Sequence, residues 1–217
     1  STYTIAKFRN WLSLKHNGNI STLNALWNTN FTRFDNVTIT IPIAVSKRGT
    51  AEWYDWCRFN MDRGTEWLTF LHDALRKGNP DAKTHVKIKP DLFIEESRSH
   101  GLDFEALTDL TEVSGNDAKT RKRNNNGSGD NTWADNYAYF WEELAVGYDF
   151  MESVSPNKIH INSEVHYLST SQYRDLAMTP EYVRSCYWLA TLHGMDVGLT
   201  WLWSRKPSGS VEDRLLA

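Results

Sequence analysis

The stretch that decides the fold is KIHINSEVH at residues 158–166, in which apolar and polar side chains alternate. Because successive side chains of a strand point to opposite faces, this alternation predicts a strand with one apolar and one polar face. The polar face carries His160, Asn162, Glu164 and His166. A strand buried on both faces of a parallel sheet is apolar throughout, so this polar row requires a reason. In a parallel barrel the inward face opens into the active site at the carboxyl ends of the strands, which predicts a chemical role for Glu164.

These polar residues also have structural interpretations. A single glutamate at a strand end is compatible with a solvated rim residue or an ion-pair partner. His160 lies deeper in the strand and is interpreted as a hydrogen-bonded core histidine. His166 lies beyond Glu164 and is placed to reach a substrate hydroxyl.

Outward from this strand, the pattern after Pro80 alternates strands with helices. Strands are expected at 85–89, 111–114, 158–165 and 197–203, and helices from 103, at 133–153 and at 180–193. This alternation is typical of a parallel sheet covered by helices. Before Pro80, apolar spacing predicts helices at 4–16, from a Ser21 cap and at 51–77, with an irregular stretch at 28–49.

The number of strands decides the architecture. A closed barrel of this class needs eight strands and typically about 250 residues, whereas these 217 residues supply four good strands. The sequence therefore predicts an α/β fold in which residues 1–217 form half of a (β/α)8 TIM barrel, about four parallel strands with covering helices. Ser1 and Ala217 then look like cut ends. The missing half of the barrel or a second copy of the chain is the expected partner, and an open four-stranded α/β domain is the alternative.

Composition narrows the function classes. A net charge of −3 gives no broad basic surface, which argues against nucleic acid as a partner. No apolar run approaches the roughly 20 residues that cross a bilayer. Cys57 and Cys186 lack metal-ligand spacing and are interpreted as buried thiols. No phosphate-binding loop or zinc-protease motif is present, so we expect neither a metal nor a cofactor. Potential glycosylation sites, at Asn19 among others, slightly favour an extracellular or periplasmic location.

The 10 tryptophans suggest sugar binding, because indole faces pack against the C–H faces of sugar rings. Trp201 and Trp203 alternate onto one face at the end of the last expected strand, where they form either a stacking wall or core packing. Arg205 follows at the rim. Two aromatic groups at helical spacing are instead expected in the core: Trp53, Trp56 and Phe59, and Trp67, Phe70 and Leu71.

Two further segments carry polar residues at expected strand ends. Lys87 and Lys89 share one face of the strand at 85–89, and an inward lysine is costly unless it has carboxylate neighbours or a water-filled cleft. Asn116 and Asp117 follow the strand expected at 111–114 and are further candidates for substrate binding.

Several segments, in order, resemble family 42 β-galactosidases of clan A. FRNWLSLKHNGNISTLNALWNTNF at 8–31 is similar to the segment that follows the acid/base strand of that family. YDWCRF at 54–59 and NPD at 79–81 resemble the next helix start and the turn before the fifth strand. IHINSEVH at 159–166 and residues 184–205 resemble the seventh strand, with its nucleophilic glutamate, and the helix and eighth strand after it. Agarases and related polysaccharide-degrading enzymes of the clan show similar segments.

This resemblance implies the C-terminal half of the catalytic barrel of a retaining β-glycoside hydrolase, acting on β-galactosides or on a galactose-containing polysaccharide. Glu164 is then the nucleophile, and the acid/base lies upstream of Ser1, so the chain alone is expected to be inactive. The implied substrate contacts are Trp201, Trp203, Asn162, His166, Arg205 and Asp117. Two alternatives remain. One is a non-catalytic carbohydrate-binding or structural half-barrel, and the other is a complete small hydrolase that uses Glu95, Glu96 or Glu112 as the partner carboxylate.

Overall fold

The computed structural model describes residues 2–40, 43–90, 102–118, 141–165, 180–200 and 208. These residues divide into two compact units. The first takes residues from 1–71 and 97–103, and the second takes residues from 72–96 and 104–217. The helix α3 (Ala51–Gly78) begins in the first unit, and its last turns belong to the second.

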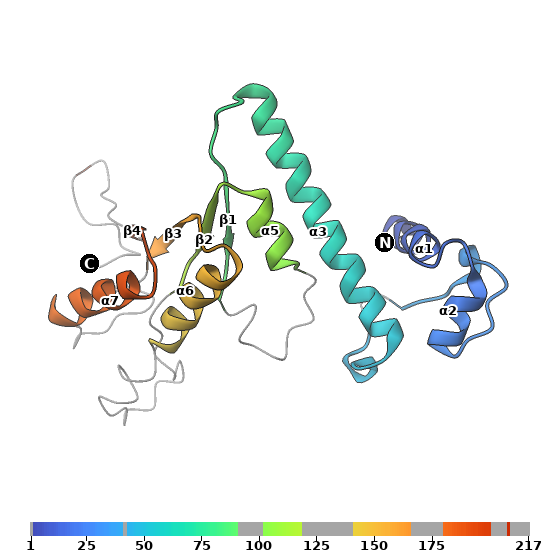
Figure 1. Ribbon diagram of the computed structural model, residues 1–217. Coiled ribbons are helices and arrows are strands. Elements are labelled where there is room, and N and C mark those ends of the chain that lie inside the picture. The colour runs from blue at the N-terminus through green and yellow to red at the C-terminus, as the bar shows by residue number, and fades with distance from the viewer. Residues whose placement is uncertain are drawn as a thin grey trace. The chain divides into compact units, whose positions relative to one another are not determined.

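The first unit is helical (Figure 1). It contains α1 (Thr2–Lys15), α2 (Ile20–Trp27), the short 3-10 helices η1 (Phe34–Asn36) and η2 (Val45–Lys47), and most of α3. Asn17 and Gly18 take positive φ values of 51° and 71° in the turn after α1, as predicted for the helix stop. The predicted cap of α2 is wrong by two residues. Asn19 is the N-cap, and its side chain accepts a hydrogen bond from the Ser21 amide.

Aromatic rings fill the core of the first unit. Phe8 is fully buried and contacts the rings of Trp11, Trp27, Trp56 and Phe59. The prediction that Trp53, Trp56 and Phe59 belong to the core is confirmed. Buried Asp55 accepts hydrogen bonds from Lys15 and from the Trp27 indole N–H, which satisfies a carboxylate that would otherwise be costly inside this core.

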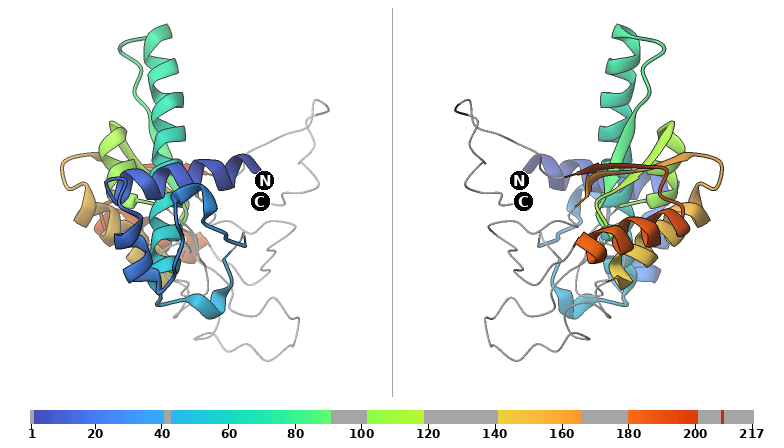
Figure 2. Two further views of the ribbon diagram at one scale, coloured as in Figure 1. Left: turned by 90° about the vertical axis from the view of Figure 1, so that its right-hand side faces the viewer. Right: turned by 90° about the vertical axis from the view of Figure 1, so that its left-hand side faces the viewer.

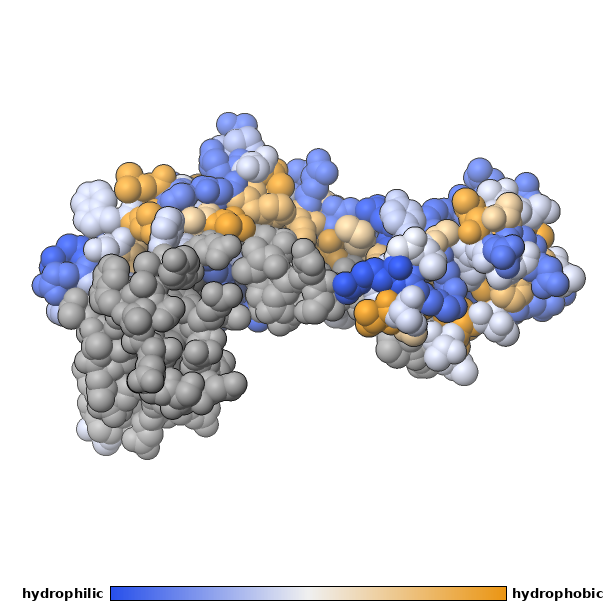
Figure 3. Space-filling view, turned by 90° about the horizontal axis from the view of Figure 1, so that it is seen from below, coloured by the Kyte–Doolittle hydropathy of each residue, from blue (hydrophilic) through white to orange (hydrophobic). Residues whose placement is uncertain are grey.

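The second aromatic group on α3 is not in the core, so that prediction is wrong. Trp67 is 59% exposed and Phe70 61% exposed. Their rings stack on each other with centroids 5.7 Å apart. Figure 3, coloured by residue hydropathy, shows hydrophobic residues at the surface among hydrophilic ones. Helical spacing identifies the apolar face of a helix, but it does not say whether another element covers that face.

The second unit is built on a parallel sheet in the order β1-β2-β3-β4. Its strands are β1 (His85–Ile88), β2 (Val113–Asn116), β3 (Ile159–Val165) and β4 (Val197–Thr200). The helices between successive strands are α5 (Phe104–Leu110), α6 (Glu142–Val154) and α7 (Pro180–Leu192), and they lie on the same side of the sheet (Figures 1 and 2). The predicted α/β alternation is confirmed.

The two faces of this sheet differ. On the helix-covered face, Ser114 contacts Met151 of α6, and Thr200 is 2.7 Å from the Tyr187 hydroxyl of α7. The open face carries the neighbouring register positions Lys87, Gly115 and Ile161. Exposed apolar side chains also lie on the open face, namely Ile159, Val197 and Leu199.

Strand β2 begins two residues later than predicted. The Thr111 hydroxyl bonds to the carbonyls of Leu107 and Val113, which ends α5 and turns the chain into the strand. The strand predicted at 197–203 is described as far as Thr200, and the first part of the helix predicted at 133–153 lies outside the described residues.

Candidate active site

An irregularity in β3 decides where Glu164 points. Asn162 donates to the Ala118 carbonyl at 2.7 Å and to the Tyr148 hydroxyl at 2.9 Å, so its side chain lies on the helix-covered face. Regular alternation would put Glu164 on the same face. The register with β4 shifts between Asn162 and Val165, and fully buried Val165 packs in the same cluster as Tyr148. Glu164 therefore leaves the strand on the open face.

The predicted single polar face of this strand is accordingly wrong. His160 and Asn162 face the helices, whereas Glu164 reaches the open side. The His160 Nε2 atom lies 3.0 Å from the Ser155 carbonyl, and its Nδ1 atom lies 3.4 Å from Glu152. Its interpretation as a hydrogen-bonded core histidine is confirmed, since it is 2% exposed.

Glu164 meets a lysine and an aspartate on the open face. Lys87 of β1 donates a hydrogen bond to Glu164 Oε2, and its Nζ lies 3.5 Å from Asp117 Oδ2. The side chains of Lys87 and Glu164 are 34% and 23% exposed, whereas Asp117 is 5% exposed. The three groups come from the carboxyl ends of neighbouring strands, which is where parallel α/β folds hold their active sites.

Gly115 on the open face of β2 has no room for a side chain. It stands between Lys87 and Ile161 in the register, and a Cβ atom there would lie 2.3 Å from the His85 ring nitrogen Nδ1. A side chain at Gly115 would therefore force the His85 ring to move on the face that carries the site.

The two carboxylates change the pKa of Lys87. Burial alone would lower the pKa of Lys87, but the hydrogen bond to Glu164 and the charge of Asp117 outweigh it and raise this pKa above its usual 10.5. The expectation that an inward lysine would have carboxylate neighbours is confirmed. Among the described residues, the buried Asp117 Oδ1 has no hydrogen-bond partner, so it is placed to accept one from a ligand or from another part of the chain.

Asn162 acts on the backbone beside the site. Its Oδ1 accepts a hydrogen bond from the Glu164 amide at 3.0 Å, and its side chain is fully buried. In this structure Asn162 therefore fixes the main chain that carries Glu164, and its own side chain contacts protein groups. Alternation of apolar and polar residues does not reveal the strand irregularity or this bond.

The other predicted contacts can be placed only in part. Asn116 is buried, and its Oδ1 accepts a hydrogen bond from the Ala118 amide. The remaining predicted contacts lie outside the described residues, and they are His166, Trp201, Trp203 and Arg205.

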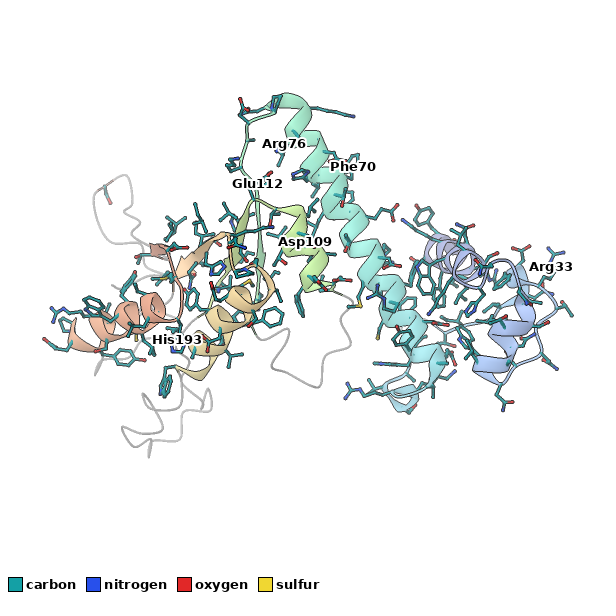
Figure 4. The ribbon with its side chains drawn as sticks, in the orientation of Figure 1. Arg33, Phe70, Arg76, Asp109, Glu112 and His193 are labelled. Atoms are coloured by element: carbon teal, nitrogen blue, oxygen red, sulfur yellow. The ribbon has the colours of Figure 1, made fainter. Side chains whose placement is uncertain are left out.

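Glu112 does not join this group. It directly precedes β2, at the opposite end of the strands from Glu164, and it accepts hydrogen bonds from the Thr84 amide and hydroxyl. Figure 4 shows it near Arg76, whose Nη2 lies 3.1 Å from Glu112 Oε1. This position removes Glu112 as the partner carboxylate of Glu164. Glu95 and Glu96 lie outside the described residues.

The described residues provide neither a metal site nor a membrane-spanning helix. They contain no group of three or more His, Cys, Asp and Glu side chains that could hold a metal ion. No described helix combines the length and the apolar character needed to cross a membrane.

Comparison with known proteins places the fold. A family model described as beta-galactosidase, of glycoside hydrolase family 42, matches residues 2–216. The chain is similar to the apo exo-carrageenase of that family from Bacteroides ovatus, with 45% identity and a TM-score of 0.86 over 99% of this chain and 29% of that one. It spans less than a third of that relative. A search of curated proteins gives no match.

More distant structures share the fold. A beta-galactosidase from the haloarchaeon Halorubrum lacusprofundi is 17% identical, with a TM-score of 0.73 over 96% of this chain and 33% of its own. An exo-beta-agarase is 11% identical, with a TM-score of 0.51 over 89% of this chain and 24% of its own.

Proposed function

This chain belongs to glycoside hydrolase family 42, the beta-galactosidase family, and from that premise we propose that it supplies the nucleophile, Glu164, of a retaining β-glycosidase acting on galactose-containing carbohydrate. Residues 1–217 would then form the C-terminal half of the catalytic barrel. The acid/base carboxylate would lie in the half that precedes Ser1, so the present chain alone would not turn over a glycoside.

The observation that carries this proposal is the position of Glu164. It is a partly exposed carboxylate at the carboxyl end of a barrel strand, turned by an irregularity onto the face away from the helices. The Lys87 cation holds its carboxylate, and the hydrogen bond that its amide donates to Asn162 holds its backbone. A nucleophile needs this combination of ionisation, fixed geometry and access.

The reaction follows from two carboxyl groups about 5 to 5.5 Å apart. A Glu164 oxygen attacks the anomeric carbon as the glycosidic C–O bond breaks, and the acid/base gives its proton to the leaving oxygen. The product is a glycosyl ester of Glu164. The acid/base then takes a proton from water, the water oxygen attacks the same carbon, and Glu164 leaves as a carboxylate.

Other residues are proposed as substrate contacts. Asp117 would accept a hydrogen bond from a sugar hydroxyl through Oδ1, which has no hydrogen-bond partner among the described residues. Trp201 and Trp203 would stack on the sugar ring, and His166 and Arg205 would bind its oxygens at the rim. Asn162 would support Glu164 through the backbone, without touching substrate.

The similarity to an exo-carrageenase favours a polysaccharide substrate. That relative shares 45% of its aligned residues with this chain, whereas the beta-galactosidase from Halorubrum lacusprofundi shares 17%. We therefore propose a galactan of the carrageenan class ahead of a simple galactoside. Carrageenan oligosaccharides and nitrophenyl β-galactoside, assayed in parallel, distinguish the two.

The test of Glu164 uses the protein that contains both halves of the barrel. Glu164→Gln should lower kcat by about 10⁴-fold or more while ligand still binds, because the covalent step is lost. Glu164→Gly with added azide should form the α-glycosyl azide, since azide attacks from the face that the carboxylate occupied. Glu105→Gln, a change of the same type at an exposed site on α5, should leave turnover unchanged.

A non-catalytic carbohydrate-binding or structural half-barrel makes the opposite prediction. Activity and sugar binding would then be the same in Glu164→Gln as in the unchanged protein, and azide would give no product. Turnover by residues 1–217 alone would contradict the proposed location of the acid/base.

A further inference from the structure

Lys87 is bonded to the carboxylate that would carry the covalent intermediate. It lies on β1, two strands away from Glu164, and reaches it past Gly115. Asp117 at the end of β2 contacts the same ammonium group, so Lys87 lies between two carboxylates, one partly exposed and one buried.

We propose that Lys87 is a positioning residue that holds the Glu164 carboxylate and assists its departure from the glycosyl ester in the second step of the reaction. This inference rests on the proposed function, because it requires Glu164 to be the nucleophile.

The charge of Glu164 changes twice in the cycle, and Lys87 responds differently to each change. In the first step the carboxylate charge disappears as the C–O ester bond forms, and a cation bonded to the carboxylate disfavours this loss of charge. The hydrogen bond from Lys87 also keeps the carboxylate in place, which favours the same step. In the second step the ester bond breaks and both of its electrons return to the Glu164 oxygen. A cation that donates to this carboxyl group stabilises the developing charge. Lys87 therefore favours the second step selectively.

Asp117 explains how Lys87 can stay in place through both steps. While Glu164 is an ester, Lys87 would otherwise face the site without an anionic partner. The Asp117 carboxylate, 3.5 Å from Lys87 Nζ, takes no part in the ester bond and is fixed by its burial. The ammonium group is thereby kept within reach of Glu164 when the ester breaks.

The test is Lys87→Met in the protein with both halves, assayed with a nitrophenyl glycoside whose good leaving group makes the second step limiting. The expected fall in kcat is about ten- to hundredfold, the effect of one charge-assisted hydrogen bond. KM should fall with it, so that kcat/KM, which reports the first step, changes by about threefold or less. A pre-steady-state burst of nitrophenol should appear as the ester accumulates.

Control variants separate this role from a structural one. Lys83→Met removes the same charge from an exposed residue just before β1 and should leave both kinetic constants unchanged. Lys87→Arg restores a cation and should recover most of kcat. If Lys87→Met does not fold, Lys87→Gln keeps a hydrogen-bond donor at this position without the charge and should lower kcat and KM in the same direction.

Two different failures are distinguishable. If kcat and kcat/KM fall equally in Lys87→Met and no burst appears, Lys87 does not assist the second step, although Glu164→Gln is still inactive. An active Glu164→Gln variant would instead overturn the proposed function itself.

Discussion

Glu112 stands directly before β2 and fixes the amino ends of two strands. Its Oε2 accepts hydrogen bonds from the Thr84 amide at 2.9 Å and from the Thr84 hydroxyl at 3.0 Å, just before β1. Its Oε1 pairs with Arg76 in the last turn of α3. The hydrogen bonds from Thr84, with the charge of Arg76, lower the pKa of Glu112 from 4.5 to about 2.

This lowered pKa predicts a pH dependence of stability. A carboxyl group with a lower pKa in the folded state stabilises the protein above its unfolded pKa. The free-energy difference between the unchanged protein and Glu112→Gln should therefore be largest above about pH 4.5 and should disappear as the pH falls to about 2. Urea unfolding at a series of pH values measures it. Asp109→Asn is the control, because the described residues give exposed Asp109 no hydrogen bond or ion pair. A difference independent of pH would contradict the assignment.

At the scale of the elements, Gly147 sets how closely α6 approaches the ends of the strands. A Cβ atom there would lie 2.9 Å from the Ala118 methyl group and 3.1 Å from the Pro90 ring. In a helix interior, alanine is more favourable than glycine by about 1 kcal/mol of intrinsic helix propensity. Overpacking costs about 1–3 kcal/mol. Here it should outweigh the gain in helix propensity, because Ala118 and Pro90 are both buried.

We therefore predict that Gly147→Ala lowers the free energy of unfolding by up to about 2 kcal/mol, measured by urea unfolding with circular dichroism of the helices. Adding Ala118→Gly removes the closer contact and should recover part of this loss. An increase in stability would show that helix propensity outweighs the packing contact.

Elements were more predictable than the directions of their side chains. Alternation placed β1 and β3 within about one residue of where they lie, because hydrophobic period follows from strand geometry. The same alternation assigned Asn162 and Glu164 to one face, since no local pattern marks the shift of register that follows Asn162. The partnership of Lys87 with a carboxylate could be inferred from the cost of burying a lysine. That this carboxylate is Glu164 could not be inferred, because Glu164 is distant from Lys87 in the sequence.

At the scale of the whole molecule, each unit has its own apolar cluster, yet none of the described helices covers the second face of the sheet. The cluster of the second unit packs α6 and α7 against one face. On the other face Leu199 and Ile159 are each 53% exposed. Parallel sheets are usually buried on both faces. The upstream half-barrel that we propose would cover this face and bring the acid/base opposite Glu164.

A substitution on the open face tests this arrangement in two contexts. In residues 1–217 alone, Leu199→Asp should change the free energy of unfolding by about 0.5 kcal/mol or less, as for other surface positions. In the protein with the upstream half, the same change would bury a charge and should cost about 3 kcal/mol or more. Leu144→Asp, the same substitution at a fully buried residue of α6, should be strongly destabilising in both contexts. If Leu199→Asp has the same small effect in both, the upstream half does not cover this face, and the acid/base must reach Glu164 from elsewhere.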